Sequence, residues 1–348
     1  MIIIGMLHHR KDPGKVRKSY SYAVVAKAEG AELLYFSPKA VDFKKRRIYG
    51  YFYREGKWER VESRFPDVIY NTGSPEKFKQ SDSIIRQLKE IIPFTTHSIG
   101  NKISVYNRLK EDGTFSHYLI PTHIIYSLNH FIKHLEMYHN LVIKPVNGHK
   151  GQDITFIEPK EEKYYLHSED EETLLNKDEL LDYVSKKLKE EKYLIQPYIN
   201  CKTKTGNAYD FRLHTQKNGE GKWVITAIYP RISPPGSIVS NISNGGSTNY
   251  LVPFLKQEYG EKYYDIKQYL EHFSIKLSKK MDELQLKFFN ETIDELGIDA
   301  GLDDMNKIWI FEVNWRPGCP PTFYLELDVV KNTINYAIYL AKNQRVNR

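Results

Sequence analysis

The sequence predicts an α/β protein built from more than one packed unit. Short apolar runs typical of strands alternate with amphipathic stretches typical of helices along most of the chain. The 348 residues are 41% hydrophobic, and at about 150 residues per domain this length leaves room for two or three cores. No repeat or low-complexity tract interrupts the pattern, so we expect globular units rather than a solenoid or a disordered chain.

The first unit is expected at residues 1–96, as a small sheet with parallel strands. Apolar runs at 2–4, 33–36 and 68–70 predict its strands, and a helical stretch at 20–29 ends at Gly30. Two further runs, 47–53 and 57–61, flank the turn Arg54-Glu55-Gly56 and predict an added hairpin.

Two more units are expected, at residues 97–198 and 199–348. In the central unit the pattern predicts helices at 104–111 and 178–189 and strands at 123–126, 141–146, 154–157 and 193–198. In the last unit it predicts strands at 209–216, 222–229, 297–302 and 308–314, a long helix from Ile266 to Leu284 and a terminal helix at 327–341. A loop rich in Ser, Asn, Gly and Pro spans 233–249, and the turn 303–307 joins the last two strands.

Composition and charge narrow the class of protein. The apolar run at residues 1–6 is far shorter than the roughly 18 residues of a membrane span and has no preceding basic region, so we expect neither a membrane segment nor a secretory signal. Because the only cysteines are Cys201 and Cys319, a disulfide framework is excluded and a cytoplasmic location is expected. The excess positive charge, +7, is spread along the chain and interleaved with acidic residues, which favours a solvated surface over a nucleic-acid interface. It also suits an anionic substrate. No pattern indicates an oligomeric state.

Oxygen ligands are expected on the last two strands. Glu312 and Asn314 lie two positions apart and therefore on one face of the strand 308–314, with Phe311 and Val313 on the other. If the strand 297–302 pairs with it through the turn, Asp299 lies beside Glu312. Asp299, Glu312 and Asn314 then predict a Mg²⁺ site with open positions for phosphate oxygens. The alternative is the polar face of an exposed hairpin.

A lysine within an apolar strand indicates an anionic partner. Lys144 lies in the run 141–146, where an unpaired ammonium group would be costly to bury. A glycine-bracketed turn follows, and its backbone N–H groups can approach phosphate oxygens. The turn consists of Gly148, His149, Lys150 and Gly151. We expect phosphate binding here, with an ordinary surface hairpin as the alternative; the chain has neither a Walker A loop nor a Gly-x-Gly-x-x-Gly motif.

Two arginines and a polar loop complete the candidate site. Asp210 and Arg212 share one face of the strand 209–216, and Arg231 starts the loop after the next strand. Arginine offers fixed charge and paired donors to phosphate or carboxylate groups. Asn241 and Gly246 belong to a loop that offers donors to a developing oxyanion, with a flexible surface loop as the alternative.

A protein-kinase site is excluded by spacing. Lys144 in its strand and Asp210-Phe211-Arg212 imitate a kinase lysine and metal-binding aspartate. A kinase needs a His-Arg-Asp catalytic loop before that aspartate, but Asp210 follows Pro197 by only thirteen positions and no such loop occurs there.

The order of these residues resembles the ATP-grasp ligases. The resemblance covers nearly the whole chain and rests on Asn101-Lys102, Lys144, Gln196-Pro197-Tyr198-Ile199, Asp210-Phe211-Arg212 and Glu312-Val313-Asn314. Within these ligases the sequence is most similar to the YheC/YheD group, described as endospore coat-associated, and more distantly to the RimK-like glutamate ligases. The resemblance implies an ATP-grasp fold with an N-terminal α/β pre-ATP-grasp domain.

The resemblance also implies a role for each matching residue. Lys102 and Lys144 would contact the phosphates of ATP, beneath a lid formed by Gly148, His149, Lys150 and Gly151. Adenine would lie against Gln196, Pro197, Tyr198 and Ile199. Catalysis would use Arg212, Arg231, Asn241 and Gly246, and one or two Mg²⁺ ions, with Mn²⁺ as a substitute, would bind Asp299, Glu312 and Asn314. Trp315, Arg316 and Cys319 depart from the family pattern, so their roles stay open, and Asn101 stands where relatives often have Asp.

The implied activity is the ligation of a carboxylate to an amine, driven by ATP through an acyl phosphate with release of ADP and phosphate. The positive charge and the open polar loop favour an acidic peptide or protein as acceptor. Three alternatives stay open: an enzyme that forms ester or amide crosslinks within a peptide, a small-molecule kinase, and a non-catalytic spore-coat-associated protein that kept the fold. The spore association follows only from the resemblance.

Overall fold

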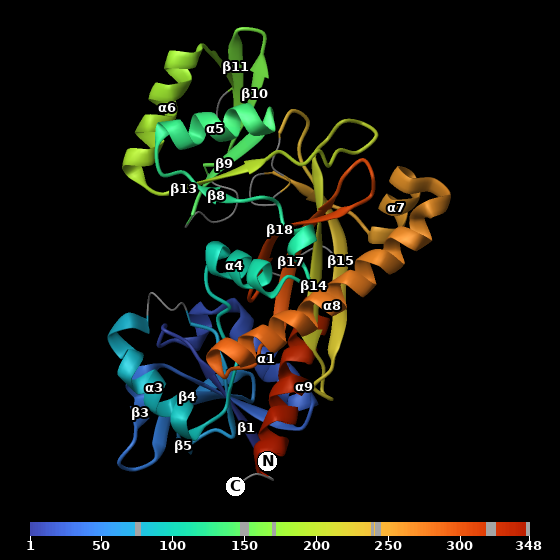
Figure 1. Cartoon of the computed structure of the whole chain (residues 1–348). Helices are drawn as coiled ribbons and strands as arrows, with labels where there is room; N and C mark the ends of the chain where they lie inside the picture. Colours follow the sequence, from blue (N-terminus) through green and yellow to red (C-terminus); the bar gives the residue numbers. More distant parts are fainter. Residues whose placement is uncertain are drawn as a thin grey trace.

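The computed structural model describes residues 1–73, 78–146, 153–168, 172–237, 240, 245–317 and 325–345. These residues form three β-sheets accompanied by helices, with the N-terminal sheet at one end of the molecule and the central sheet at the other (Figure 1). The predicted α/β class is confirmed. Among the described residues, no helix is both long and apolar enough to cross a membrane.

The N-terminal sheet has a parallel centre. Ile4 of β1 pairs with Leu33 of β2 and with Val68 of β6, both in parallel register, as the apolar runs predicted. The predicted hairpin is present, with β4 and β5 antiparallel. Helix α3 and strand β7 were not predicted. The elements are β1 (Ile2–Leu7), α1 (Arg17–Ala28), β2 (Ala31–Phe36), β3 (Val41–Asp42), β4 (Arg47–Arg54), β5 (Lys57–Arg64), β6 (Val68–Asn71), α3 (Asp82–Ile91) and β7 (Phe94–Thr95). The sheet order is β3-β4-β2-β1-β6-β7, with β5 paired to β4.

The central sheet is antiparallel. Its two helices, α5 and α6, pack into the same hydrophobic core. Helix α6 begins at a capping box in which the side chains of Asn176 and Glu179 each accept from the other residue's backbone N–H. Helix α5 was not predicted, although Ser127 caps it and Phe131 and Leu135 give it an apolar face. The elements are β8 (His123–Ile124), α5 (Leu128–Tyr138), β9 (Leu141–Pro145), β10 (Thr155–Lys160), β11 (Lys163–His167), β12 (Glu172–Leu175), α6 (Lys177–Glu190) and β13 (Tyr193–Pro197), in the sheet order β12-β11-β10-β9-β13-β8.

The C-terminal sheet is also antiparallel. Strand β15 continues to Ile232, so Arg231 lies inside a strand and not, as predicted, at the start of a loop. The long helix and the final strand pair form as expected, and α7 precedes that helix. The elements are β14 (Tyr209–Lys217), β15 (Trp223–Ile232), β16 (Ser247–Thr248), α7 (Leu251–Tyr259), α8 (Tyr263–Phe289), β17 (Glu295–Leu302), β18 (Ile308–Asn314) and α9 (Leu325–Arg345), in the sheet order β16-β15-β14-β17-β18.

Helices from one expected segment pack against the sheet of another. Helix α4 (Lys102–Asp112) contributes Val105 and Leu109 to the core of the C-terminal sheet. Helix α9, from the end of the chain, contributes Ile334 to the core of the N-terminal sheet. The backbone N–H of Thr96 also donates to the Asp294 carboxylate at 2.6 Å. Apolar faces are therefore buried against elements distant in sequence, and the boundaries 1–96, 97–198 and 199–348 stay predictions.

Candidate functional site

A cavity of about 190 Å³ lies where the central and C-terminal sheets face each other. Strands β9 and β13 supply one wall, and β14, β15, β17 and β18 supply the other. Of the predicted site residues, the lining includes Lys102, Lys144, Gln196, Pro197, Tyr198, Ile199, Arg231, Asp299 and Glu312. Residues scattered over two hundred positions are thus gathered at one place.

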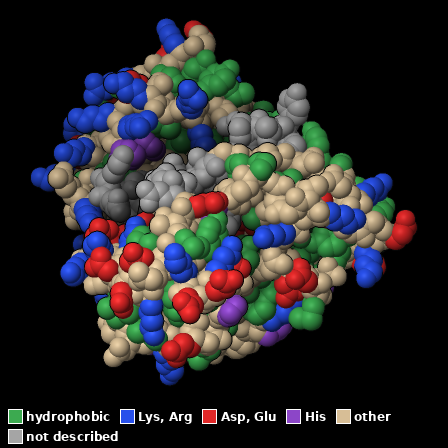
Figure 2. All heavy atoms as spheres, turned by 90° about the horizontal axis from the view of Figure 1, so that it is seen from above, with side chains coloured by type: hydrophobic (Ala, Val, Ile, Leu, Met, Phe, Trp, Pro, Cys, Tyr) green, Lys and Arg blue, Asp and Glu red, His purple; other side chains and the backbone are tan. Residues whose placement is uncertain are grey.

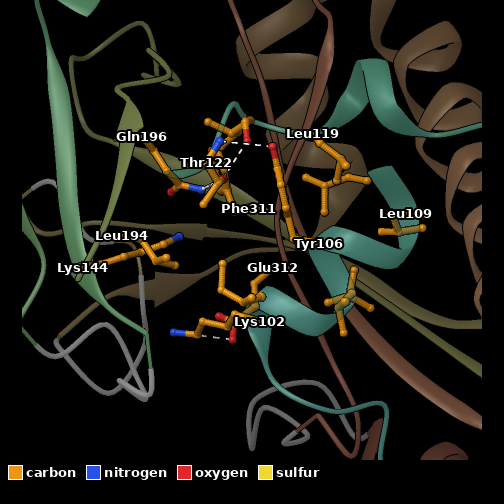
Figure 3. Close-up of a pocket in the computed structure, with 15 residues that line it drawn as sticks. Lys102, Tyr106, Leu109, Leu119, Thr122, Lys144, Leu194, Gln196, Phe311 and Glu312 are labelled. Carbon is orange, nitrogen blue, oxygen red and sulfur yellow. Dashed lines mark hydrogen bonds and ion pairs between the residues drawn. The ribbon is translucent and has the colours of Figure 1, made fainter. Parts of the chain in front are cut away.

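Two lysines reach this region from different elements. Lys102 is the first residue of α4, where the side chain of Asn101 caps the helix by accepting from the backbone N–H of Ser104. Its Nζ lies 3.7 Å from Glu312 Oε1. Lys144 projects from β9 on the facing wall, and Figure 3 shows both lysines beside Glu312. The structure therefore places two cations near one carboxylate.

Burial changes the acidity of Lys144. Loss of solvation, together with the nearby charge of Lys102, lowers the pKa of Lys144 to about 8, against the opposing effect of Glu312 and Asp299. Among the described residues, no hydrogen bond or ion pair is found for its ammonium group. An anion bound here would restore the charge balance.

The end of β13 and the residues that follow it form a largely apolar slot beside these cations. Gln196 is buried, and its Nε2 donates to Thr122 Oγ1 at 2.6 Å. Tyr198 packs edge-on against Phe156, with ring centroids 4.7 Å apart, and its backbone N–H donates to the Asn140 carbonyl. Val142, Ile154 and Phe311 also line the cavity. Such walls suit a flat, partly apolar ring.

The predicted pairing of the two acidic strands is present, with a bulge at the site. Asp299 pairs with Glu312, whereas Ala300 pairs with Ile310, so Phe311 is an extra residue on β18. A bulge breaks the two-residue alternation of a strand. Phe311, predicted on the face opposite Glu312, therefore lines the same cavity.

Gly301 has no side chain, and this lets the bulged residue Phe311 pack closely against the neighbouring strand. A Cβ on Gly301 would lie 2.5 Å from the Phe311 ring and 2.5 Å from Cys201 Sγ. No side chain fits in that space, so Gly301 permits the contact that holds Phe311 against the cavity.

Two arginines and two aspartates form a buried ion-pair network. Arg231 Nε donates to Asp210 Oδ1 at 2.7 Å, its Nη2 also pairs with Asp210 Oδ2, and it reaches Asp299 Oδ2 at 3.2 Å. Arg212 Nε donates to Asp299 Oδ1 at 2.5 Å. Although burial opposes ionisation, Arg212 and Arg231 hold the pKa of Asp299 below its usual range. Asp299 is therefore ionised.

The predicted metal ligands form a set of hard oxygen donors. Asn314 Nδ2 lies 3.3 Å from Asp299 Oδ2, and Glu312 is the cross-strand partner of Asp299. Among the described residues, no three His, Cys, Asp or Glu side chains group as a metal site; the predicted set has two carboxylates and one amide. Such a donor set fits Mg²⁺, which takes only a few protein ligands and completes its coordination with water and phosphate oxygens.

The remaining predicted residues are not placed in the cavity. Gly148, His149, Lys150, Gly151 and Asn241 lie outside the described residues. Gly246 directly precedes β16 and is not among the described residues that line the cavity. Ser240, from the predicted polar loop, lines the cavity instead.

Comparison with known proteins identifies the family. A family model described as YheC/D like ATP-grasp matches residues 91–340. The chain belongs to this family. Its similar proteins include two from Bacillus subtilis (strain 168). Endospore coat-associated protein YheD is 27% identical over 329 residues, which cover 90% of this chain and 71% of YheD. Endospore coat-associated protein YheC is 22% identical over 306 residues, which cover 83% of this chain and 81% of YheC.

Solved structures confirm the ATP-grasp fold of this YheC/D-like chain. D-alanyl-alanine synthetase A from Vibrio cholerae aligns with a TM-score of 0.55 and 12% identity, covering 100% of this chain and 99% of the other. The ATP-grasp ligase PsnB, complexed with a minimal precursor, aligns with a TM-score of 0.57 and 9% identity, covering 97% and 98%. At these identities the similarity concerns the fold alone.

Sequence reasoning left two residues of this YheC/D-like site unassigned. Asp210 was noted for sharing a face with Arg212 and as part of the family motif, but no role was assigned to it, and it holds Arg231 through two contacts. An aspartate inside a strand beside an arginine was an available signal. Phe311 gave no signal, because the bulge that turns it toward the cavity depends on the pairing of two strands.

Proposed function

We propose that this protein is an ATP- and Mg²⁺-dependent ligase that joins a carboxylate to an amine, with the cavity between the central and C-terminal sheets as its active site. The observation that carries the proposal is the gathering of Lys102, Lys144 and Glu312 in one cavity, with the Arg231–Asp299 pair. Cations for phosphates, hard oxygen donors for a metal ion and an apolar slot for a base are combined in one place. The ATP-grasp fold and the ligases that share it support the same conclusion.

The residues divide the task by their chemistry. Lys102 and Lys144 would bind phosphate oxygens, and the slot from Gln196 to Ile199 would hold adenine. Arg212 and Arg231 would hold the phosphoryl group that moves to the carboxylate. Asp299, Glu312 and Asn314 would hold Mg²⁺, which when bound neutralises phosphate charge.

The proposed reaction needs no nucleophilic side chain. A carboxylate oxygen of the substrate attacks the γ-phosphorus of ATP, and the bond from that phosphorus to ADP breaks. The nitrogen of the amine then attacks the acyl carbon and loses a proton while phosphate departs. The protein contributes position and charge. Cys201 is buried, and its pKa is raised to about 12, which makes it unsuitable as a nucleophile.

Nucleotide binding is the first test. We expect Mg²⁺-ATP or Mg²⁺-ADP at 100 times its Kd to raise the free energy of unfolding by about 2.7 kcal/mol, measured as a shift in the thermal midpoint. A Mg²⁺-dependent shift supports the site and justifies measuring ADP release with carboxylates and amines. No shift with either nucleotide contradicts the proposal and favours a non-catalytic protein that kept the fold.

Product mass separates the ligase from its alternatives. The ligase makes a product with the combined mass of two substrates minus water. A peptide that loses water without gaining a second molecule indicates an internal crosslink, and a stable phosphorylated product indicates a kinase. We expect acidic peptide acceptors to react faster than neutral ones of equal length, and equal rates would contradict that preference.

The lowered pKa of Lys144 predicts a pH dependence of nucleotide affinity. Below about pH 8 the ammonium group is charged and attracts phosphate, while at higher pH the free protein must take up a proton before it can bind. We therefore expect the affinity for Mg²⁺-ADP to fall by up to about tenfold per pH unit above pH 8, measured by calorimetry. Lys144→Met provides the control, with weaker binding and a flat profile over the same range. A flat profile for the unmodified protein contradicts the assignment of Lys144 to the phosphates.

A further inference from the structure

The positive charge of this chain is concentrated in its first 96 residues. Residues 1–96 contain 19 Lys and Arg against 11 Asp and Glu, whereas residues 97–348 contain 32 against 33. The N-terminal segment therefore carries +8 and the rest of the chain −1. The expected mixture of basic and acidic residues is therefore found in residues 97–348 but not in residues 1–96. Such an imbalance indicates a partner of opposite charge.

The densest charge lies in the turn between β3 and β4 and at the first residue of β4. Lys44, Lys45, Arg46 and Arg47 are consecutive, and all four are exposed. The register of the hairpin sets Arg47 directly opposite Arg64 of β5. Like charges at facing positions of a sheet repel each other, so each of these two arginines needs an anion nearby.

Local acids compensate only some of these cations. Arg47 Nε lies 3.5 Å from Glu62 Oε1, and Arg64 Nη2 lies 2.7 Å from Asp67 Oδ2. In the part of the chain that the structure describes, Lys45 and Arg46 take part in no ion pair. Two charges at the tip of the turn are thus available to a partner.

A pocket of about 470 Å³ opens beside this turn. Lys45, Arg46, Arg47 and Arg64 line it, with Asp67 as an acid among them. The rest of the lining is apolar and consists of Phe65, Pro66, Ile91, Ile92, Pro93 and Ala341. We call these ten side chains with Asp67 the basic pocket.

The basic pocket is remote from the nucleotide cavity. In Figure 1 the strands β3 and β5 lie at the end of the molecule opposite the central sheet. Figure 2 views the molecule from the central-sheet end, where blue basic and red acidic side chains intermingle. The basic pocket shares no lining residue with the nucleotide cavity.

We propose that the basic pocket docks an acidic polypeptide segment that also carries apolar side chains. Carboxylates of the segment pair with Lys45 and Arg46 at the rim, and its apolar side chains fill the floor between Phe65 and Ile92. Aliphatic and proline side chains at the floor suit a peptide better than a single-stranded nucleic acid, which binds along a basic track with open aromatic faces. Here Arg46 lies over the Phe65 ring, 5.8 Å from its centroid. The segment can belong to a substrate or to another partner, and the binding does not depend on the ligase activity.

Charge reversal at the rim tests the proposal. The probe is a fluorescently labelled peptide of alternating Glu and Leu residues, and its anisotropy is followed with the full-length protein without nucleotide. We expect binding that weakens with added salt and that falls at least about tenfold in the double variant K45E/R46E, because each reversal removes an attraction and adds a repulsion. The matched control K186E/K189E changes two exposed lysines of α6 and should bind as the unmodified protein does.

Three results would overturn the proposal. One is equal binding of the acidic peptide to the unmodified protein and to a folded K45E/R46E variant. Another is equally tight binding of a probe with Gln in place of Glu, which would show that binding does not depend on the charge of the peptide. The third is a labelled oligothymidylate that binds more tightly than the acidic peptide and competes with it, which would assign the pocket to nucleic acid. Circular dichroism establishes that each variant is folded.

Discussion

Glu312→Gln is expected to reduce ATP-dependent ADP formation by at least about a hundredfold. Glu312 faces Asp299 across the last strand pair and lies 3.7 Å from the Lys102 ammonium group. The substitution keeps the volume of the side chain but removes a charge that the metal ion and the two lysines would share. Turnover is measured as ADP release, and nucleotide binding as the Mg²⁺-dependent thermal shift, which should also be lost.

Glu283→Gln is the matched control for this prediction. Glu283 also pairs with a lysine, at 2.9 Å from Lys280 Nζ, but it lies exposed on α8 away from the cavity. This variant should keep the activity and the thermal shift of the unmodified protein. If folded Glu312→Gln releases ADP at the unmodified rate, Glu312 is not a metal ligand, whatever the control shows.

Asp210→Asn is expected to lower the free energy of unfolding by about 3 kcal/mol. The side chains of Asp210 and Arg231 are 8% and 7% exposed, so the guanidinium group of Arg231 would lose its main carboxylate partner inside the protein. Asp299 Oδ2, 3.2 Å away, still offers partial compensation. Chemical denaturation monitored by circular dichroism measures the change.

Two companion variants identify the cause of that loss. Asp82→Asn removes one partner of the exposed Arg86–Asp82 pair, 2.6 Å apart, and should leave the denaturation midpoint almost unchanged. The double variant Asp210→Leu with Arg231→Met replaces both charges by apolar groups and should recover most of the stability, but it should form no ADP because Arg231 is lost. A double variant as unstable as Asp210→Asn would show that the pair itself, and not the unpaired charge, is responsible.

The central part of the site followed from local patterns. Lys144 stood out because an isolated cation in an apolar strand needs an anion, and the structure places it in the cavity. The pairing of Asp299 with Glu312 followed from a short turn between two strands, since such a turn fixes the register. The parallel strands of the N-terminal sheet followed in the same way from apolar runs separated by helical stretches.

Other features depend on contacts between segments that no local pattern links. Phe311 faces the cavity because the strand pair carries a bulge, and a bulge arises only when two strands meet. The clustering of the basic pocket depends in part on Arg64, which lies opposite Arg47 only once the hairpin has formed.

The sequence by itself determined the α/β class, the order of most of the strands and helices, and the residue types at the site, because these depend on interactions between near neighbours. Only the tertiary structure decided that α4 packs on the C-terminal sheet and α9 on the N-terminal sheet. The same holds for the pairing of Arg231 with both Asp210 and Asp299. The reason is physical: burial of apolar faces and of charged groups is satisfied by whichever surfaces meet in space, and sequence distance does not limit that choice.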